Sequence, residues 1–385
     1  MLKTSISLFF VVSVIFSTIY TPQAILPTLK DVFHISMMQT NFLLSGMLFV
    51  LMLTTPLYAP LARRYEKKKI MMISIFFLFI AVLLSAFASN YYWLLLSRVM
   101  QGIFIPGITA IMLSYVQEIY PKEYKGLGMG IYMAATGFGA VIGRLLAGWI
   151  TYLYSWKEAF WFFAFLLLIA LLAMAWGLPK TKFDKNSKAK VQIKALWGYL
   201  ANTQILSILL VPMVVFFTFM AITTFVTYHL TQEPFLLNAS QLANFFLILL
   251  LAVIVSPLAG RYSDKIGRVK ILYLGLLFLI IGILLTLSSS LFLVVVGVGF
   301  VTIGMFTVQS VTPTYLGDIV PNDRTTVAVL YQSFFYLGGA LGTLVPAWVW
   351  EYGSYEGVVM LCLILIVLGT TPLTYKILNL TNLKK

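Results

Sequence analysis

The stretch TPLYAPLARRYEKKKI at residues 55–70 returns in altered form as SPLAGRYSDKIGRVKI at residues 256–271. The two segments align without a gap, and the matching positions include Pro56 with Pro257, Leu57 with Leu258, Lys67 with Arg268, Lys69 with Lys270 and Ile70 with Ile271. A second pair, YVQEIYPKE at 115–123 and YLGDIVPND at 315–323, has nearly the same separation. A repeat of this extent predicts that the chain is built from two similar halves in parallel orientation.

The composition indicates that both halves lie in a membrane. Of the 385 residues, 61% are hydrophobic and 10% charged, whereas soluble domains carry about 25% charged residues. A spanning helix needs about 20 apolar residues. The sequence therefore predicts an all-α polytopic membrane protein with twelve transmembrane helices in two pseudo-symmetric six-helix bundles, near 5–28, 40–62, 70–89, 91–117, 126–153, 157–178, 203–229, 239–262, 270–288, 290–316, 325–349 and 355–379.

The domain division follows from the position of the longest polar segment. We expect an N-terminal bundle at 1–178, a cytoplasmic lysine-rich linker at 179–202 and a C-terminal bundle at 203–385. Parallel repeats of six spans are an architecture of secondary transporters, whose substrate site lies near the midplane at the repeat interface.

The net charge of +14 is explained by topology. Most lysines and arginines fall in loops that share one side of the membrane when both termini are cytoplasmic, as the positive-inside rule requires. We therefore expect a multi-pass protein of the plasma membrane of a bacterium, with the lipid bilayer and not nucleic acid as its partner.

Catalytic and metal-binding signatures are absent from the sequence. The single cysteine, Cys362, excludes an internal disulfide and a cysteine metal cluster. There is no H-E-x-x-H, G-x-S-x-G or P-loop pattern. We expect no enzyme activity, no cofactor and no metal site.

Two arginines, Arg98 and Arg144, fall inside predicted spans, where a charged side chain normally faces a bundle interior or a water-filled cavity. No carboxylate lies at their depth, and the nearest titratable candidates are Asp31 and His34 at the external mouth of the first span. Three roles stay open for the arginines: coupling to protons, attraction of an anionic substrate, or hydrogen bonding to backbone carbonyls of the first helix.

Several motifs resemble the major facilitator superfamily. The segment around SDKIGRVK resembles its loop signature G-x-L-A-D-R-x-G-R-K, and LLLSRVMQG resembles its fourth-helix motif R-x-x-Q-G. GFGAVIGRLLAGW and FYLGGALGTLVPAW look like segments of its bacterial drug–proton antiporters and sugar-efflux permeases. The matching positions are Gly260, Asp264, Lys265, Gly267 and Arg268 for the loop, and Arg98, Gln101 and Gly102 for the helix.

The first-half loop departs from this signature, because Arg63 stands where the family has an aspartate at its cytoplasmic gate. An aspartate suits a helix N-terminus, and an arginine inverts that sign. We expect Arg63 or Arg64 to pair with Asp318 or Asp323, and Asp264 to face the start of the fifth helix near Lys125 and Gly126.

The fifth-helix motif lacks its usual proline, since Ala140 follows Gly139. Small residues at four-residue spacing allow helices to approach closely. We expect a helix-packing role for Gly102, Gly139, Gly143, Gly338 and Gly342.

The resemblance implies that helices 1, 4, 7 and 10 line the cavity. Candidate contacts are Tyr20, Gln23, Gln101, Phe216, Phe219, Gln309, Gln332 and Tyr336. Aromatic rings with a few amides suit a small organic molecule better than an inorganic ion. We expect a monomeric, proton-driven exporter of small organic compounds that works by alternating access. The alternatives are an organic-anion carrier that uses Arg98 and Arg144, and a receptor or scaffold that transports nothing.

Overall fold

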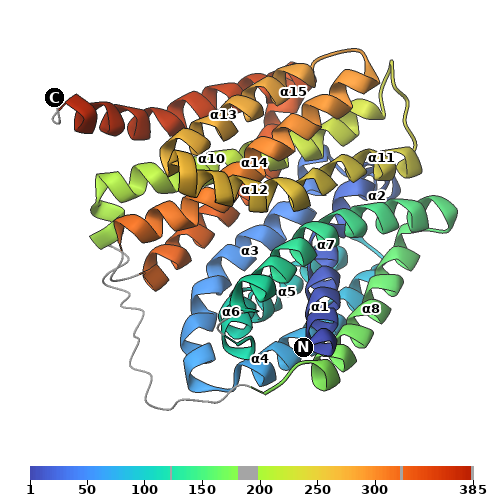
Figure 1. The fold of residues 1–385 in the computed structure, drawn as a ribbon. Helices are drawn as coiled ribbons and strands as arrows, with labels where there is room; N and C mark the ends of the chain where they lie inside the picture. Colours follow the sequence, from blue (N-terminus) through green and yellow to red (C-terminus); the bar gives the residue numbers. More distant parts are fainter. Residues whose placement is uncertain (122–123, 181–197, 321–323, 383–385) are drawn as a thin grey trace. The chain divides into compact units, whose positions relative to one another are not determined.

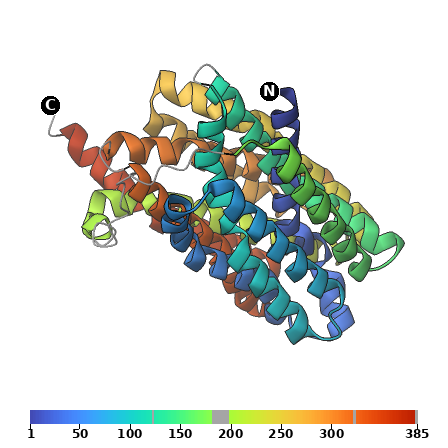
Figure 2. The same ribbon diagram turned by 90° about the horizontal axis from the view of Figure 1, so that it is seen from below.

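The computed structural model describes residues 1–121, 124–180, 198–320 and 324–382. Within them, contacts divide the chain into two units, one from Met1–Lys190 with Leu230–Val253 and the other from Val191–His229 with Ile254–Lys385 (Figures 1 and 2). The described residues hold helices and no strand.

The first unit is built mainly from the N-terminal half of the chain. Its helical elements are α1 (Leu2–Tyr20), η1 (Thr21–Ile25), α2 (Leu26–Phe33), α3 (Met37–Arg64), α4 (Lys67–Ala86), α5 (Tyr91–Phe104), α6 (Pro106–Ile119), α7 (Lys125–Leu153), α8 (Trp156–Gly177), α11 (Ala239–Phe245) and η3 (Phe246–Leu250). The helices α1, α7 and α8 lie against one another, as Figure 1 shows. The short α11 also packs on α7.

The second unit contains the remaining helices. They are α10 (Thr203–Leu230), α12 (Leu251–Ile266), α13 (Arg268–Leu285), α14 (Leu291–Ile319) and α15 (Arg324–Asn382). Helices α13 and α14 pack along each other, and α15 contacts both. The eighth span is divided between the two units. Its elements α11 and η3 belong to the first unit, and most of α12 belongs to the second.

Among the residues that the structure describes, eleven helices are long and apolar enough to cross a membrane. The last of these spans 49 residues, Val327–Tyr375, which at 1.5 Å per residue is more than twice the roughly 30 Å of a bilayer core. Ser354 interrupts it with φ 49° and ψ −148°. The interruption separates two crossings, so the predicted number of twelve spans agrees with the structure.

The predicted packing glycines lie where helices approach most closely. A Cβ atom on Gly139 or Gly143 would overlap the backbone carbonyl of Ser13 or Ser17 on α1. In the second unit, Gly338 and Gly342 lie in the same way against the carbonyls of Met213 and Phe217 on α10. The two halves thus repeat one contact between their first and fifth helices. Gly102 likewise lies against the Met47 carbonyl of α3.

Candidate functional site

The first membrane span is discontinuous. Helix α1 ends at Tyr20, and the 3-10 segment η1 carries Pro22 in its first turn before α2 resumes. Proline has no N–H group, so the carbonyl of Thr18, four residues earlier, loses its helical partner. A 3-10 turn moves the next backbone bonds to partners three residues away, which also releases the carbonyl of Ile19. Both carbonyls are in the buried interior of the first unit.

Arg98 of α5 satisfies these two carbonyls. Its Nη1 donates to Thr18 O at 3.0 Å, and its Nη2 donates to Ile19 O at 3.0 Å. Its Nε donates to the carbonyl of Leu43 on α3 at 3.3 Å. The side chain is fully buried. Arg98 therefore joins the fourth span to the second and to the break in the first, which is the hydrogen-bonding role left open above.

Gln101, one turn further along α5, completes the same network. Its Oε1 accepts a hydrogen bond from Arg98 Nη1, and its Nε2 donates to Ser85 Oγ at 2.9 Å. Ser85 and Ser97 are themselves joined at 2.7 Å between their Oγ atoms. In the structure this amide, predicted to contact substrate, is engaged with protein groups at both of its ends.

Arg144 of α7 lies at the other side of the break, and its environment differs. Its Nε donates to Gln23 Oε1 at 2.7 Å, and its Nη1 donates to the Ala140 carbonyl of its own helix at 2.7 Å. Its Cζ lies 4.1 Å from the centre of the Tyr20 ring and 5.3 Å from that of Phe246. Its Nη2 is buried and has no hydrogen-bond partner among the described residues.

The structure thus brings together three predicted residues, Tyr20, Gln23 and Arg144, in one buried cluster of the first unit. Phe246 of η3 completes the cluster and was missed by the sequence reasoning. An aromatic residue in a predicted span gives no signal of its own, because most such residues only pack. The neighbouring contact of Trp149 Nε1 with Asn244 Oδ1 at 3.0 Å holds α11 beside α7.

The two titratable candidates of the first span, Asp31 and His34, differ from this cluster in burial. Asp31 lies in α2, and His34 caps that helix in a left-handed conformation, with φ 49°. Both side chains are exposed. In the described part of the chain, the ion pairs are Lys67 with Glu118, and Arg268 with two aspartates.

Arg268 organises the loop motif of the second unit. It pairs with Asp264 through Nη1 and with Asp318 through Nε, the latter at 3.2 Å. Its Nη1 also donates to Ser263 Oγ at 2.7 Å. Gly267 precedes it with φ 106°, a conformation that favours glycine. Arg268 thus ties the start of α13 to the end of α14.

The other predicted gate residues either form no ion pair within the described residues or lie outside them. Gly260 lies in α12 with no heavy atom within 4 Å of a built Cβ, and Lys265 and Arg64 are exposed. Asp323 and the side chains of Arg63 and Lys125 lie outside the described residues. The expected pairing of Arg63 or Arg64 with Asp318 or Asp323, and of Asp264 with the start of α7, stays a prediction.

In the second unit, the predicted cavity residues belong to an aromatic group. Phe216 stacks on Phe335 with ring centres 3.9 Å apart, and Phe219 contacts Phe306 edge-on at 6.0 Å. Tyr336 lies edge-on to Phe335. Gln332 and Gln309 are half-buried, and the Gln309 carbonyl accepts a hydrogen bond from Tyr331. The predicted cavity residues of the second unit are thus mainly aromatic, whereas the predicted site residues of the first unit include the charged Arg144.

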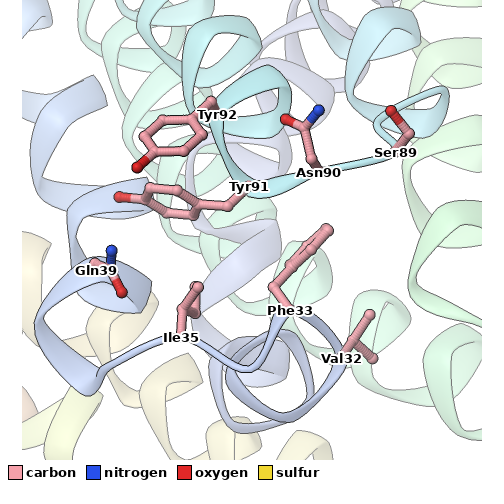
Figure 3. Close-up of a pocket in the computed structure, with 8 residues that line it drawn as sticks. All are labelled: Val32, Phe33, Ile35, Gln39, Ser89, Asn90, Tyr91 and Tyr92. Carbon is pink, nitrogen blue, oxygen red and sulfur yellow. The ribbon is translucent and has the colours of Figure 1, made fainter.

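A separate pocket of about 410 Å³ lies where α2 ends and where α3 and α5 begin (Figure 3). Figure 3 shows the Tyr91 and Tyr92 rings beside each other on one side, with Phe33 and Gln39 opposite. None of the predicted site residues lines it.

A comparison with protein families decides the class of the molecule. The model of the major facilitator superfamily matches residues 8–249 and 232–380. The chain belongs to the major facilitator superfamily. As a member of this family it is a membrane transporter with a small-molecule substrate, and not an enzyme.

Relatives of this transporter occur in several bacteria. It is 25% identical to an uncharacterized transporter of Buchnera aphidicola subsp. Schizaphis graminum, over 91% of this chain and 86% of that protein. It is 25% identical to the uncharacterized MFS-type transporter YybF of Bacillus subtilis, over 89% and 86%. It is 22% identical to the inner membrane transport protein YnfM of Escherichia coli, over 93% and 86%.

Solved structures of two transporters share its fold. One is a bacterial homologue of the human lysosomal transporter Spinster, in an inward-facing and occupied conformation, with a TM-score of 0.78, 17% identity and coverage of 96% of this chain and 95% of that one. The other is the human organic anion transporter TETRAN, with a TM-score of 0.74, 17% identity and coverage of 96% and 99%. At these identities the likeness concerns the fold alone.

Proposed function

We propose that this transporter exports small organic compounds from a bacterial cell by alternating access, driven by the proton gradient. The observation that carries the proposal is the broken first span, around which Tyr20, Gln23, Gln101 and Arg144 are buried. Discontinuous membrane helices form the substrate sites of many secondary transporters, because their unwound backbone can coordinate a solute. Aromatic rings and amides around such a break suit an organic solute.

The aromatic group of the second unit supports the same class of substrate. Phe216 and Phe219 on α10 present stacked rings, and Tyr336 on α15 lies edge-on to Phe335, which stacks on Phe216. Rings recognise apolar surface, while Gln309 and Gln332 can fix orientation through hydrogen bonds. We assign the five predicted residues among these to substrate recognition by the second unit.

The distribution of charge and the name of one relative support the proposed membrane and orientation. The Escherichia coli relative is an inner membrane protein by name. The basic residues of the loops, Lys67, Arg64 and Lys265 among them, gather on the side that the positive-inside rule assigns to the cytoplasm. We propose a bacterial plasma-membrane protein, a monomer, with both termini in the cytoplasm.

Proton coupling is assigned to the external mouth of the first span. Asp31 and His34 are exposed there, and their carboxylate and imidazole are groups that can bind a proton. They lie at the end of α2, which follows η1 directly in the chain, so a change in their charge acts on the same span that carries Tyr20 and Gln23.

The experiment uses the purified full chain in liposomes with an imposed pH gradient. Uptake of labelled benzoate, benzylamine and benzyl alcohol would be followed with and without the gradient. Saturable movement of at least one compound, accelerated by the gradient, is the expected result. Absence of saturable transport and of counter-flow for every organic compound would contradict the proposal and favour a receptor or scaffold.

A further inference from the structure

We propose that Arg144 binds the carboxylate of a small monoanion with an apolar, preferably aromatic, body. The proposal rests on the proposed function and names its substrate class. The two intramembrane arginines are both buried and belong to the same unit. They differ in how many of their nitrogens have a hydrogen-bond acceptor among the described residues.

Arg98 is satisfied by the protein itself. All three of its nitrogens donate to protein oxygens, namely the carbonyls of Leu43, Thr18 and Ile19 together with the Gln101 amide. The two released carbonyls of the broken helix present partial negative charge to the guanidinium. Each nitrogen of Arg98 therefore already has at least one acceptor within the protein.

Arg144 is satisfied only in part. Nε and Nη1 each have one acceptor, Gln23 and Ala140, whereas Nη2 is buried with none among the residues that the structure describes. No described carboxylate forms an ion pair with it. A buried guanidinium with an unused nitrogen and no counter-charge is unfavourable unless a partner joins it. The missing partner is one negative charge.

The groups around the Arg144 guanidinium indicate which of its edges the anion would bind. The Tyr20 ring lies 4.1 Å from Cζ and the Phe246 ring 5.3 Å, and Gln23 occupies the Nε side. The edge of the guanidinium with the fewest acceptors is the end of the fork, where Nη2 makes no hydrogen bond with the described residues and Nη1 makes one. A carboxylate fits this edge with one oxygen on each nitrogen.

The number of charges and the neighbouring rings restrict the ligand. One unneutralised arginine matches a monoanion, since a dianion would bury an extra negative charge without a partner. The flanking Tyr20 and Phe246 rings offer apolar contact to the rest of the molecule. Aromatic and aliphatic monocarboxylates therefore fit better than phosphate esters or polycarboxylates.

Binding is measured first, in detergent and without transport. Sodium benzoate is added to the purified full chain at constant ionic strength, and the unfolding midpoint is followed. We expect benzoate to raise the midpoint of the wild type, and benzylamine to leave it unchanged. Arg144→Gln should abolish the rise, and Arg144→Lys, which keeps the charge but not the fork, should weaken benzoate binding at least tenfold.

The matched control is Arg261→Gln. Arg261 is exposed on α12 and has no role in the cluster, so this variant removes the same group and should keep the full response to benzoate. If Arg144→Gln does not fold, Arg144→Lys and the wild-type selectivity for benzoate over benzylamine still test the proposal. An equal rise with sodium chloride alone would overturn it, because Nη2 would then bind an inorganic ion. A response to benzoate that persists in both Arg144 variants would overturn it as well.

Transport separates this inference from the proposed function. If benzoate binds through Arg144 but no organic compound moves in liposomes, the inference stands and the proposed function fails. If benzylamine or benzyl alcohol is carried while benzoate neither binds nor moves, the proposed function stands and the inference is wrong.

Discussion

The Nη1 atom of Arg98 donates a 3.0 Å hydrogen bond to the Thr18 carbonyl, the carbonyl that Pro22 leaves without a helical partner. A charged side chain of the fourth span therefore replaces a backbone donor of the first. The arrangement explains how an arginine is accommodated in an otherwise apolar segment, because its donors meet carbonyls that would otherwise be buried without a partner.

Replacing Arg98 with leucine should destabilise the protein by about 3 kcal/mol or more, because several buried carbonyls lose their donor at about 1–3 kcal/mol each. Unfolding of the purified variant in detergent measures the loss. A double-mutant cycle with Pro22→Ala is the control, since alanine restores an N–H that can return to the Thr18 carbonyl. Strictly additive losses would show that the arginine and the break are not coupled.

Replacing Gly139 or Gly143 with alanine should destabilise the first unit by about 1–3 kcal/mol, the usual cost of overpacking. The new methyl group would overlap the backbone carbonyl of Ser13 or Ser17, which cannot move away as a flexible side chain can. The matched control on the same helix is Gly130→Ala, where no heavy atom lies within 4 Å. There alanine should be neutral or stabilising by up to about 1 kcal/mol. Equal effects at positions 139 and 130 would contradict the packing role.

Replacing Arg268 with alanine should change stability by no more than about 1 kcal/mol, because its carboxylate partners are largely exposed. Transport should nevertheless slow, since the start of α13 is then no longer tied to the end of α14. Initial uptake rates and unfolding midpoints are compared with those of Arg261→Ala. A transport rate equal to that of the control would remove Arg268, Asp264 and Asp318 from the gate.

Replacing Asp31 with asparagine and His34 with glutamine should remove acceleration by the pH gradient while leaving exchange of substrate across the membrane intact. The reason is that exchange needs no net proton movement. Uptake driven by a gradient and counter-flow without one are measured in the same liposomes. If the double variant keeps full acceleration, coupling does not use the external mouth of the first span.

The charged groups show where prediction from sequence reaches its limit. Arg98 and Arg144 were recognised as buried cations from their positions alone, because a long apolar run gives them no other place. Their roles stayed open, since the roles depend on acceptors that lie far away in the chain. Arg98 meets carbonyls about 80 residues earlier, and backbone carbonyls carry no mark in a sequence. The ring of Phe246 beside Arg144 was not foreseen for the same reason.

The sequence by itself determined the membrane-spanning segments, the twofold repeat and the family. Long apolar runs predict membrane helices because the bilayer core sets the length of a span, and the repeated loop predicts two similar halves. Only the tertiary structure decided that the first span breaks at Pro22, that Arg98 fills the break, and that Arg144 keeps a nitrogen without a partner. Those outcomes depend on which groups meet across several helices, and hydrogen-bond partners separated by about 80 to 120 residues are set by packing and not by local pattern.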